Sequence, residues 1–234
     1  MIYLPQALAH VQAPKILTAA QIATRLDGVP CFLIVNAQGQ PLTATQNPTG
    51  PEGAAKPKPA IGVFLRQKPA AAFLEALQKR DPAAAALKLK VVSLGEVYRN
   101  AQKPEANISL AFIPDPEQVE LAKKLIAQQA KPGVAFTAGV PLFIAELTGK
   151  GLLNVSQNGK TTVPVFFSLA DLTPVVERYN KQKPEGTPEA KIVVTTLEFL
   201  LQNWGVKPDP ALAQMQLLIN KAVVDEAKTL TGGS

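Results

Sequence analysis

The chain has 234 residues, of which 47% are hydrophobic and only 18% charged, enough apolar material for a core and too little charge for an intrinsically disordered protein. Its 24 basic and 18 acidic residues give a formal net charge of +6, but the bases lie scattered in pairs such as Lys123-Lys124, which argues against a nucleic-acid-binding groove. A single cysteine excludes an intrachain disulfide, and no apolar run approaches the roughly 20 residues that cross a bilayer.

The first elements are predicted from their boundary signals. Thr18, followed three residues later by Gln21, is a capping box, so a helix is expected to begin there and to end at Asp27-Gly28. Hydrophobic periodicity and turn residues then predict, in order, strands 31–36 and 41–45, a Pro- and Gly-rich loop 46–59, strand 61–65, helix 69–80, strand 87–92 and a helix from Ser93.

The second half of the chain predicts a similar series. It contains strand 142–147, a turn at 148–151, strand 152–157, an Asn158-Gly159 hairpin, strand 161–167, helix 170–181, strand 192–194 and a helix from Thr195. Each half is followed by Pro-Asp-Pro, where Asp115 and Asp209 are expected N-caps of amphipathic helices. The second of these helices is predicted to carry Met215 and Leu218 on one apolar seam.

The two halves resemble each other in sequence. Residues 61–100 align with 163–202 without a gap, placing Val63-Phe64 on Val165-Phe166 and repeating one helical apolar stripe. Because two copies of one unit usually pack together to bury their apolar faces, we expect an α+β fold in a single domain of residues 1–234. It would contain two pseudo-symmetric repeats of an antiparallel meander plus helices, about 16–130 and 131–234, that share one core.

Candidate catalytic groups are few. His10 is the single histidine, and Cys31 lies in an apolar strand pattern typical of an inert buried residue. Glu96 and Glu198 recur at equivalent positions, but each stands three residues after a hydroxyl, Ser93 or Thr195, which predicts a capping box rather than acid–base chemistry. No catalytic, cofactor-binding or metal-ligating residue is therefore predicted, and no cofactor is expected.

Apolar side chains remain as candidates for a binding site. Most are expected in the core, but grooves between amphipathic helices and a sheet could bind polypeptide segments or a partner. The candidate groove residues are Phe32, Phe64, Phe73, Phe143, Phe166, Val175, Met215 and Leu218.

Several short motifs occur in an order that resembles a known family. They are Gly-Val-Pro-Cys-Phe at 28–32, Val-Phe-Leu at 63–65 before an amphipathic helix, Val-Val-Ser-Leu-Gly-Glu-Val-Tyr at 91–98 and Gly-Val-Pro-Leu-Phe at 139–143. Over residues 16–205 the chain is similar to the twenty-two-kilodalton subunit of the chloroplast inner-envelope protein-import translocon, in its cyanobacterial branch. The 46–59 insertion is longer than expected for that family.

The resemblance implies a non-enzymatic, chaperone-like protein of a cyanobacterial periplasm or the plastid intermembrane space. Its expected partners are unfolded precursor or outer-membrane proteins, an Omp85-type pore or other translocon subunits, and the surface of a membrane, with no nucleic acid. Met1 to Pro5 lack the features of a signal peptide, so this location rests on the resemblance. Two alternatives stay open: an adaptor that binds one folded translocon partner through a flat interface, and an enzyme of unrecognised type.

Overall fold

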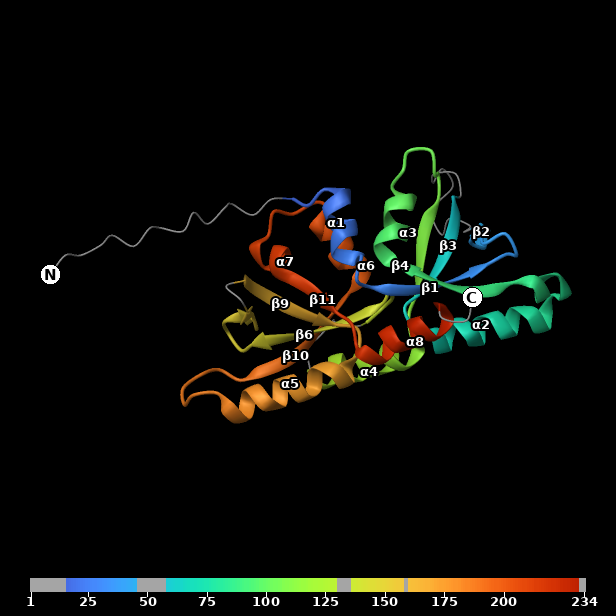
Figure 1. Cartoon of the computed structure of the whole chain (residues 1–234). Helices are drawn as coiled ribbons and strands as arrows, with labels where there is room; N and C mark the ends of the chain where they lie inside the picture. The colour runs from blue at the N-terminus through green and yellow to red at the C-terminus, as the bar shows by residue number, and fades with distance from the viewer. Residues whose placement is uncertain (1–15, 46–57, 130–135, 158–159, 232–234) are drawn as a thin grey trace.

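The computed structural model describes residues 16–45, 58–129, 136–157 and 160–231 as two sheets with helices on both sides (Figure 1). The first half contains α1 (Ala19–Leu26), β1 (Pro30–Val35), β2 (Thr43–Thr45), β3 (Pro59–Phe64), α2 (Gln67–Arg80), the 3₁₀ helix η1 (Pro82–Ala86), β4 (Lys88–Ser93), α3 (Leu94–Ala101), β5 (Ser109–Ile113) and α4 (Pro116–Gln128). The second contains β6 (Pro141–Leu147), β7 (Gly151–Leu152), β8 (Val155–Gln157), β9 (Lys160–Phe166), α5 (Leu169–Gln182), β10 (Ala190–Thr196), α6 (Leu197–Trp204), α7 (Pro210–Gln214), β11 (Met215–Leu218) and α8 (Lys221–Thr231). The expected mixture of helices and sheets is confirmed.

The two sheets have the same order of principal strands. Sheet A runs β4-β1-β3-β5 with β2 beside β3, and sheet B runs β10-β6-β9-β11 with β7 and β8 beside β6 and β9. In both sheets one aromatic pair lies in register, Phe32 opposite Phe64 and Phe143 opposite Phe166. Superposition of the two halves as equivalent repeats stays a prediction.

At one edge of each sheet, a strand that pairs in parallel is added to the predicted antiparallel meander. β5 pairs with β3 in parallel, and β11 pairs with β9 in parallel. Neither strand was predicted, and residues 215–218 were expected to be helical. Met215 to Leu218 instead form a strand opposite Val163 to Phe166, because pairing with an existing sheet edge outweighs the weak helical periodicity of four residues. The helix capped by Asp209 is accordingly short and ends at Gln214.

The last helix of each half packs on the sheet of the other half. α4 follows β5 of sheet A but packs on β6 and β10 of sheet B, where Ala122 is fully buried and the Gln129 side chain donates to the Ile192 carbonyl. α8 follows β11 of sheet B but packs on β1 and β4 of sheet A, where Glu226 accepts a 3.2 Å bond from Arg66. Figure 1 shows α2, α8, α4 and α5 on one side of the sheets and α1, α3, α6 and α7 on the other.

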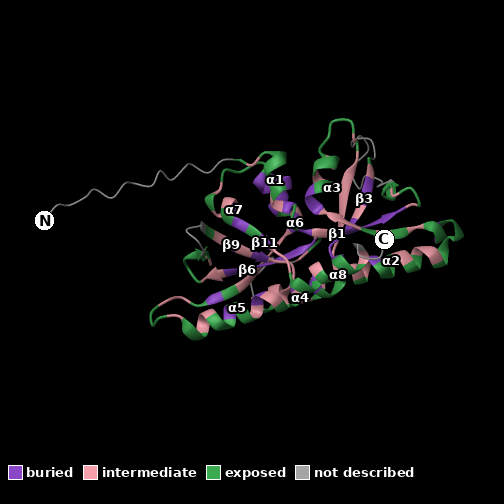
Figure 2. Cartoon of the chain, viewed as in Figure 1, coloured by how far each residue is buried: buried purple, intermediate pink, exposed green. Residues whose placement is uncertain are grey.

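The core follows from the alternation of side chains along the strands. Cys31, Leu33 and Val35 of β1 join one central cluster that includes residues of β6, whereas Phe32 and Ile34 point to the face covered by α2 and α8. We call this face the outer face of sheet A. Figure 2 shows buried positions concentrated in the strands of both sheets, and the helices exposed on their outward sides. Residues of both halves therefore meet in the central cluster, and each sheet carries a further apolar cluster on its other face.

Local cap predictions are confirmed where the partner is a near neighbour. Thr18 and Gln21 make both bonds of a capping box, and Asp115 and Asp209 cap helices that begin with proline. At the predicted 148–151 turn, the Lys150 N–H donates to the Leu147 carbonyl at 2.9 Å.

The two glutamate capping boxes are not formed as predicted. Ser93 accepts bonds from the Gly95 and Glu96 N–H groups, but no return bond from the Glu96 side chain is present. In the second half Thr196, not Thr195, is the N-cap, and Glu198 accepts the N–H of Val140 at 3.0 and 3.2 Å. The shift by one residue puts Glu198 at the second helical position, from which it reaches a neighbouring loop instead.

Three sequence predictions lie partly or wholly outside the described residues. These are His10, most of the 46–59 loop and the Asn158-Gly159 turn. β3 already begins at Pro59, and β8 and β9 pair antiparallel with Gln157 opposite Lys160.

Candidate binding groove

An apolar groove lies on the outer face of sheet A, under α2. It has a volume of about 220 Å³ and is formed by strands β1, β2, β3 and β5 together with one side chain of α2. Its lining residues are all non-polar: Ile34, Leu42, Ala44, Ala60, Gly62, Phe64, Phe73, Ala111 and Ile113. We call this cavity the sheet A groove.

The groove is open because α2 buries little of its surface against the sheet. Ala70 is the one buried residue of this 14-residue helix, and Phe73 remains 49% exposed although its ring lies 5.5 Å from that of Phe64. On the opposite rim Leu42 is 39% exposed. The corresponding helix of the second half, α5, buries both Leu172 and Val176. Although α2 and α5 share one apolar stripe in sequence, α2 buries fewer of its side chains on sheet A than α5 buries on sheet B.

Only part of the predicted groove set lies together. Phe64 and Phe73 line the sheet A groove, and Phe32 is fully buried in the cluster beneath them. Gly62 and Ala111 were not predicted; the missing side chain of Gly62 and the small side chain of Ala111 leave room for the cavity. A glycine inside the predicted strand 61–65 was the available signal, because glycine in a strand often marks a gap or a close approach.

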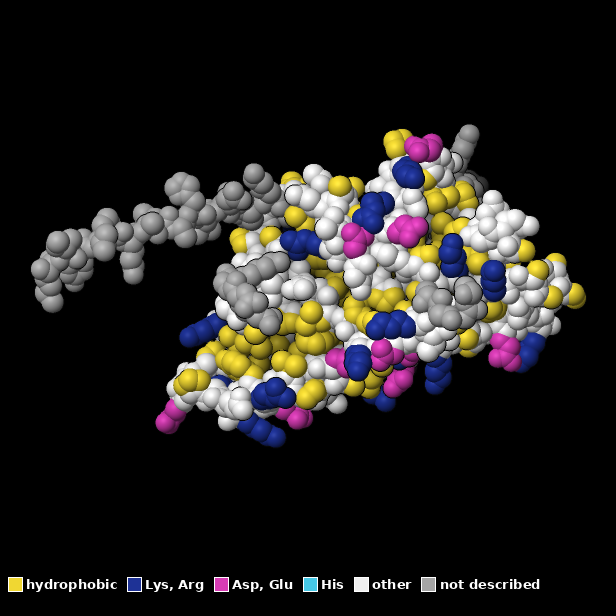
Figure 3. Space-filling view, viewed as in Figure 1, with side chains coloured by type: hydrophobic (Ala, Val, Ile, Leu, Met, Phe, Trp, Pro, Cys, Tyr) yellow, Lys and Arg dark blue, Asp and Glu magenta, His cyan; other side chains and the backbone are white. Residues whose placement is uncertain are grey.

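The remaining predicted residues belong to sheet B. Phe143 is fully buried, Phe166 is half-buried beside it, and Val175 on α5 is 39% exposed. Leu218 pairs with Phe166 across β11 and β9. Met215 is 7% exposed, in the central core on the opposite face. Figure 3 shows hydrophobic side chains gathered over β6 and β10, above α5, so sheet B also presents apolar surface.

No titratable side chain lines the sheet A groove. Elsewhere, burial raises the pKa of the Cys31 thiol to about 12, which keeps it protonated and unreactive at neutral pH. In the part of the chain that the structure describes, no cluster of three or more His, Cys, Asp or Glu side chains could hold a metal ion. The groove can therefore act through apolar contact rather than through charge or proton transfer.

The family model that describes Tic22-like proteins matches residues 5–206. The chain belongs to the Tic22-like family. Among solved structures, Anabaena Tic22, described as a protein of protein transport, matches with a TM-score of 0.72 and 25% identity, over 91% of this chain and 97% of that one. Tic22 from Plasmodium falciparum matches with a TM-score of 0.66 and 21% identity, over 91% and 98% of the two chains. A search of curated proteins gave no match.

The resemblance inferred from the short motifs is thus confirmed, and the mixed fold is that of the Tic22 structures. Across the described residues, no helix is long and apolar enough to cross a membrane.

Proposed function

We propose that this Tic22-like protein is a non-enzymatic, chaperone-like factor that binds unfolded polypeptide segments in the sheet A groove. The observation that carries the proposal is the half-exposed Phe73 over a cavity with no polar lining residue. An exposed aromatic side chain beside an open apolar cavity is typical of an interaction site rather than of a hydrophobic core.

The Anabaena relative is described as a protein of protein transport, which supports a role in assisting translocation or outer-membrane biogenesis. The clients would be unfolded precursor or outer-membrane proteins, delivered to an Omp85-type pore or translocon subunits at a membrane surface. The location that fits these clients is a periplasm or plastid intermembrane space.

The expected affinity is modest. Burying a whole apolar side chain contributes about 1.5–3 kcal/mol, and Phe73 and Leu42 each have less than half of a side chain left to bury beyond what the fold already covers. An extended client also loses conformational entropy on binding, which offsets part of this gain. Weak, reversible binding is what a transport factor needs, since its client must be released.

A test follows from the empty space beside Gly62. A side chain placed there would meet only the Phe64 ring, at 3.9 Å from the first added carbon, so Gly62→Val should fill the groove without unfolding β3. We expect the variant to melt at or above the wild-type temperature and to bind an unfolded outer-membrane barrel protein at least about tenfold more weakly, the equivalent of losing one buried side-chain contact.

The matched control is Gly28→Val, because no atom lies within 4 Å of a carbon added at Gly28 and that residue is outside the groove. Association and suppression of client aggregation should be measured at about 50 and 300 mM salt, where the Debye length falls from roughly 14 to under 6 Å. Binding through the groove should survive the higher salt. Equal binding by both variants, or binding lost entirely at 300 mM, would reject the groove and favour a charged adaptor surface.

A further inference from the structure

We propose that the free edge of β5 captures the client as an added β-strand, so that backbone hydrogen bonds hold the segment whose side chains enter the sheet A groove. This inference rests on the proposed function and specifies how the client binds. It comes from a comparison of the four outer strands of the two sheets, β4, β5, β10 and β11.

Three of these four edges are protected. β4 carries exposed Lys88 and Lys90, charges that oppose pairing with another strand, and α8 packs against it. On β10, the Asn180 side chain bonds both the N–H and the carbonyl of Ala190, and Gln129 donates to the Ile192 carbonyl. These side chains occupy the backbone groups that a new strand would need.

The β11 edge is covered by α1. The Arg25 guanidinium donates to the carbonyls of Ala213 and Met215 at 2.7 and 3.0 Å, just before and at the start of the strand. The same guanidinium lies 5.1 Å from the centre of the Trp204 ring, which fixes its position. A strand added to β11 would have to displace Arg25 from all of these contacts.

Among the described residues, α3 contacts β5, but β5 lacks the charged side chains of β4 and the side-chain bonds to backbone groups that protect β10 and β11. Within the ranges that the structure describes, its single strand partner is β3, in a parallel register from Ser109 to Ile113, and no side chain bonds its backbone. In Figure 1 it is the light green strand between α3 and β3. In a parallel pair, alternate residues point their N–H and C=O groups away from the partner, so this edge presents unpaired donors and acceptors. The strand holds no charge and no proline, the devices that usually protect an edge.

The backbone chemistry identifies the occupant. Only another extended polypeptide can satisfy a row of alternating N–H and C=O groups, so the ligand is a strand and not a helix or a small molecule. Ala111 and Ile113 line the sheet A groove, which places alternate side chains of an added strand at the mouth of the groove. A client with apolar residues at every second position fits this arrangement, and strands of outer-membrane barrels have that pattern.

The first test uses a peptide of about ten residues that alternates Leu and Ser, with terminal lysines for solubility. Two further peptides carry N-methyl groups at either all Leu or all Ser positions. Each modification keeps the side chains but removes the N–H donors of one strand edge. With the Leu side chains in the groove, the direction of the added strand, parallel or antiparallel to β5, decides which edge of the peptide meets β5. The proposal requires one direction to be preferred, so one methylated peptide should bind full-length protein about tenfold or more weakly than the parent, and the other should bind like the parent.

The second test locates the strand by cross-linking. Cys31 is fully buried, so a new cysteine at Ser109→Cys is the reactive one, and Gln216→Cys on β11 is the matched control. With a mild oxidant such as dissolved oxygen to accept the electrons, single-cysteine versions of the peptide should form disulfides with the Ser109→Cys variant at every second position, because only these side chains share its face. The control should cross-link weakly and without periodicity.

The outcomes separate the two proposals. If the parent peptide binds, and Gly62→Val weakens it, but both methylated peptides bind equally well or the β11 variant cross-links as efficiently, edge capture is wrong and the groove alone holds the client. If the parent peptide and the unfolded barrel protein both fail to bind, the proposed function and edge capture are rejected together.

Discussion

Replacing Gly95 by alanine should separate α1 from α3. A carbon added at Gly95 would lie 2.4 Å from the Ala23 carbonyl oxygen, 2.9 Å from the Asp27 nitrogen and 2.2 Å from the Asp27 Oδ1 atom. The Asp27 carboxylate is the end of a side chain and can turn away, but the other two atoms belong to the backbone of α1 and of its C-cap residue. Since unstrained carbon contacts lie at about 3.5–4.0 Å, the two helices must move apart by roughly 1 Å.

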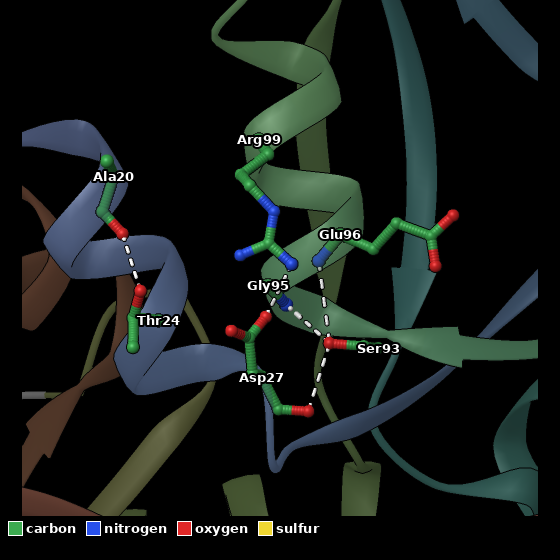
Figure 4. A network of polar contacts seen from close by, with 7 residues as sticks. All are labelled: Ala20, Thr24, Asp27, Ser93, Gly95, Glu96 and Arg99. Atoms are coloured by element: carbon green, nitrogen blue, oxygen red, sulfur yellow. Dashed lines mark hydrogen bonds and ion pairs between the residues drawn. The ribbon is translucent and has the colours of Figure 1, made fainter.

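That movement disturbs a group of polar contacts that joins the helices (Figure 4). Asp27 accepts a 2.6 Å bond from Arg99, and its carbonyl accepts a 3.0 Å bond from the Ser93 hydroxyl, which itself caps α3. Overpacking costs about 1–3 kcal/mol, and the gain in helix propensity returns up to about 1 kcal/mol. We expect a net loss of about 1 kcal/mol and, for a protein of this size, a melting temperature lower by about 2–4 °C.

Thermal unfolding followed by circular dichroism measures this shift, and Gly28→Ala is the control because no atom lies within 4 Å of the added carbon. Gly28→Ala should change the melting temperature by less than about 2 °C, as for most surface changes away from special contacts. Equal melting temperatures for Gly95→Ala and wild type would show that α1 and α3 are not in close contact in solution.

Two further predictions concern single groups. Burial raises the pKa of Cys31 from 9.0 to about 12, so the unfolded state loses this proton first and the free energy of unfolding should fall as pH rises between these values. Denaturant titrations at several pH values should show a shallower fall for Cys31→Ala than for the wild type. Identical slopes of unfolding free energy against pH for the two proteins would contradict the burial. Glu198→Ala should lose about 1–2 kcal/mol because the Val140 N–H is left without its acceptor, whereas Glu198→Gln retains one and should lose less in the same titrations.

The sequence predicted best those features whose partners are close in the chain. Thr18 finds Gln21 three residues away, and Asp115 caps its own helix, so the residue types alone specify these contacts. Glu198 could not be assigned this way, since its partner Val140 lies 58 residues away. β5 and β11 were missed for the same reason: short apolar segments become strands only because β3 and β9 offer an edge.

The groove was predicted only in part. Large aromatic side chains such as Phe64 and Phe73 are conspicuous in a sequence, and both line the cavity. The size of an opening, however, depends on what is missing, and here it depends on Gly62, Ala111 and the loose seating of α2. No residue pattern distinguishes Phe32 beneath the groove from Phe73 above it, because their exposure is decided by tertiary packing.

Because α8 packs on sheet A, the outer face of this sheet cannot be fully covered until residues 221–231 have been synthesised. Leu230 of α8 packs against the cluster of Phe32 and Ile34, some two hundred residues after those side chains emerge from the ribosome. Until then, α2 is the one described helix available to cover this apolar face. The proposed chaperone-like factor therefore exposes apolar surface of its own while it is being synthesised.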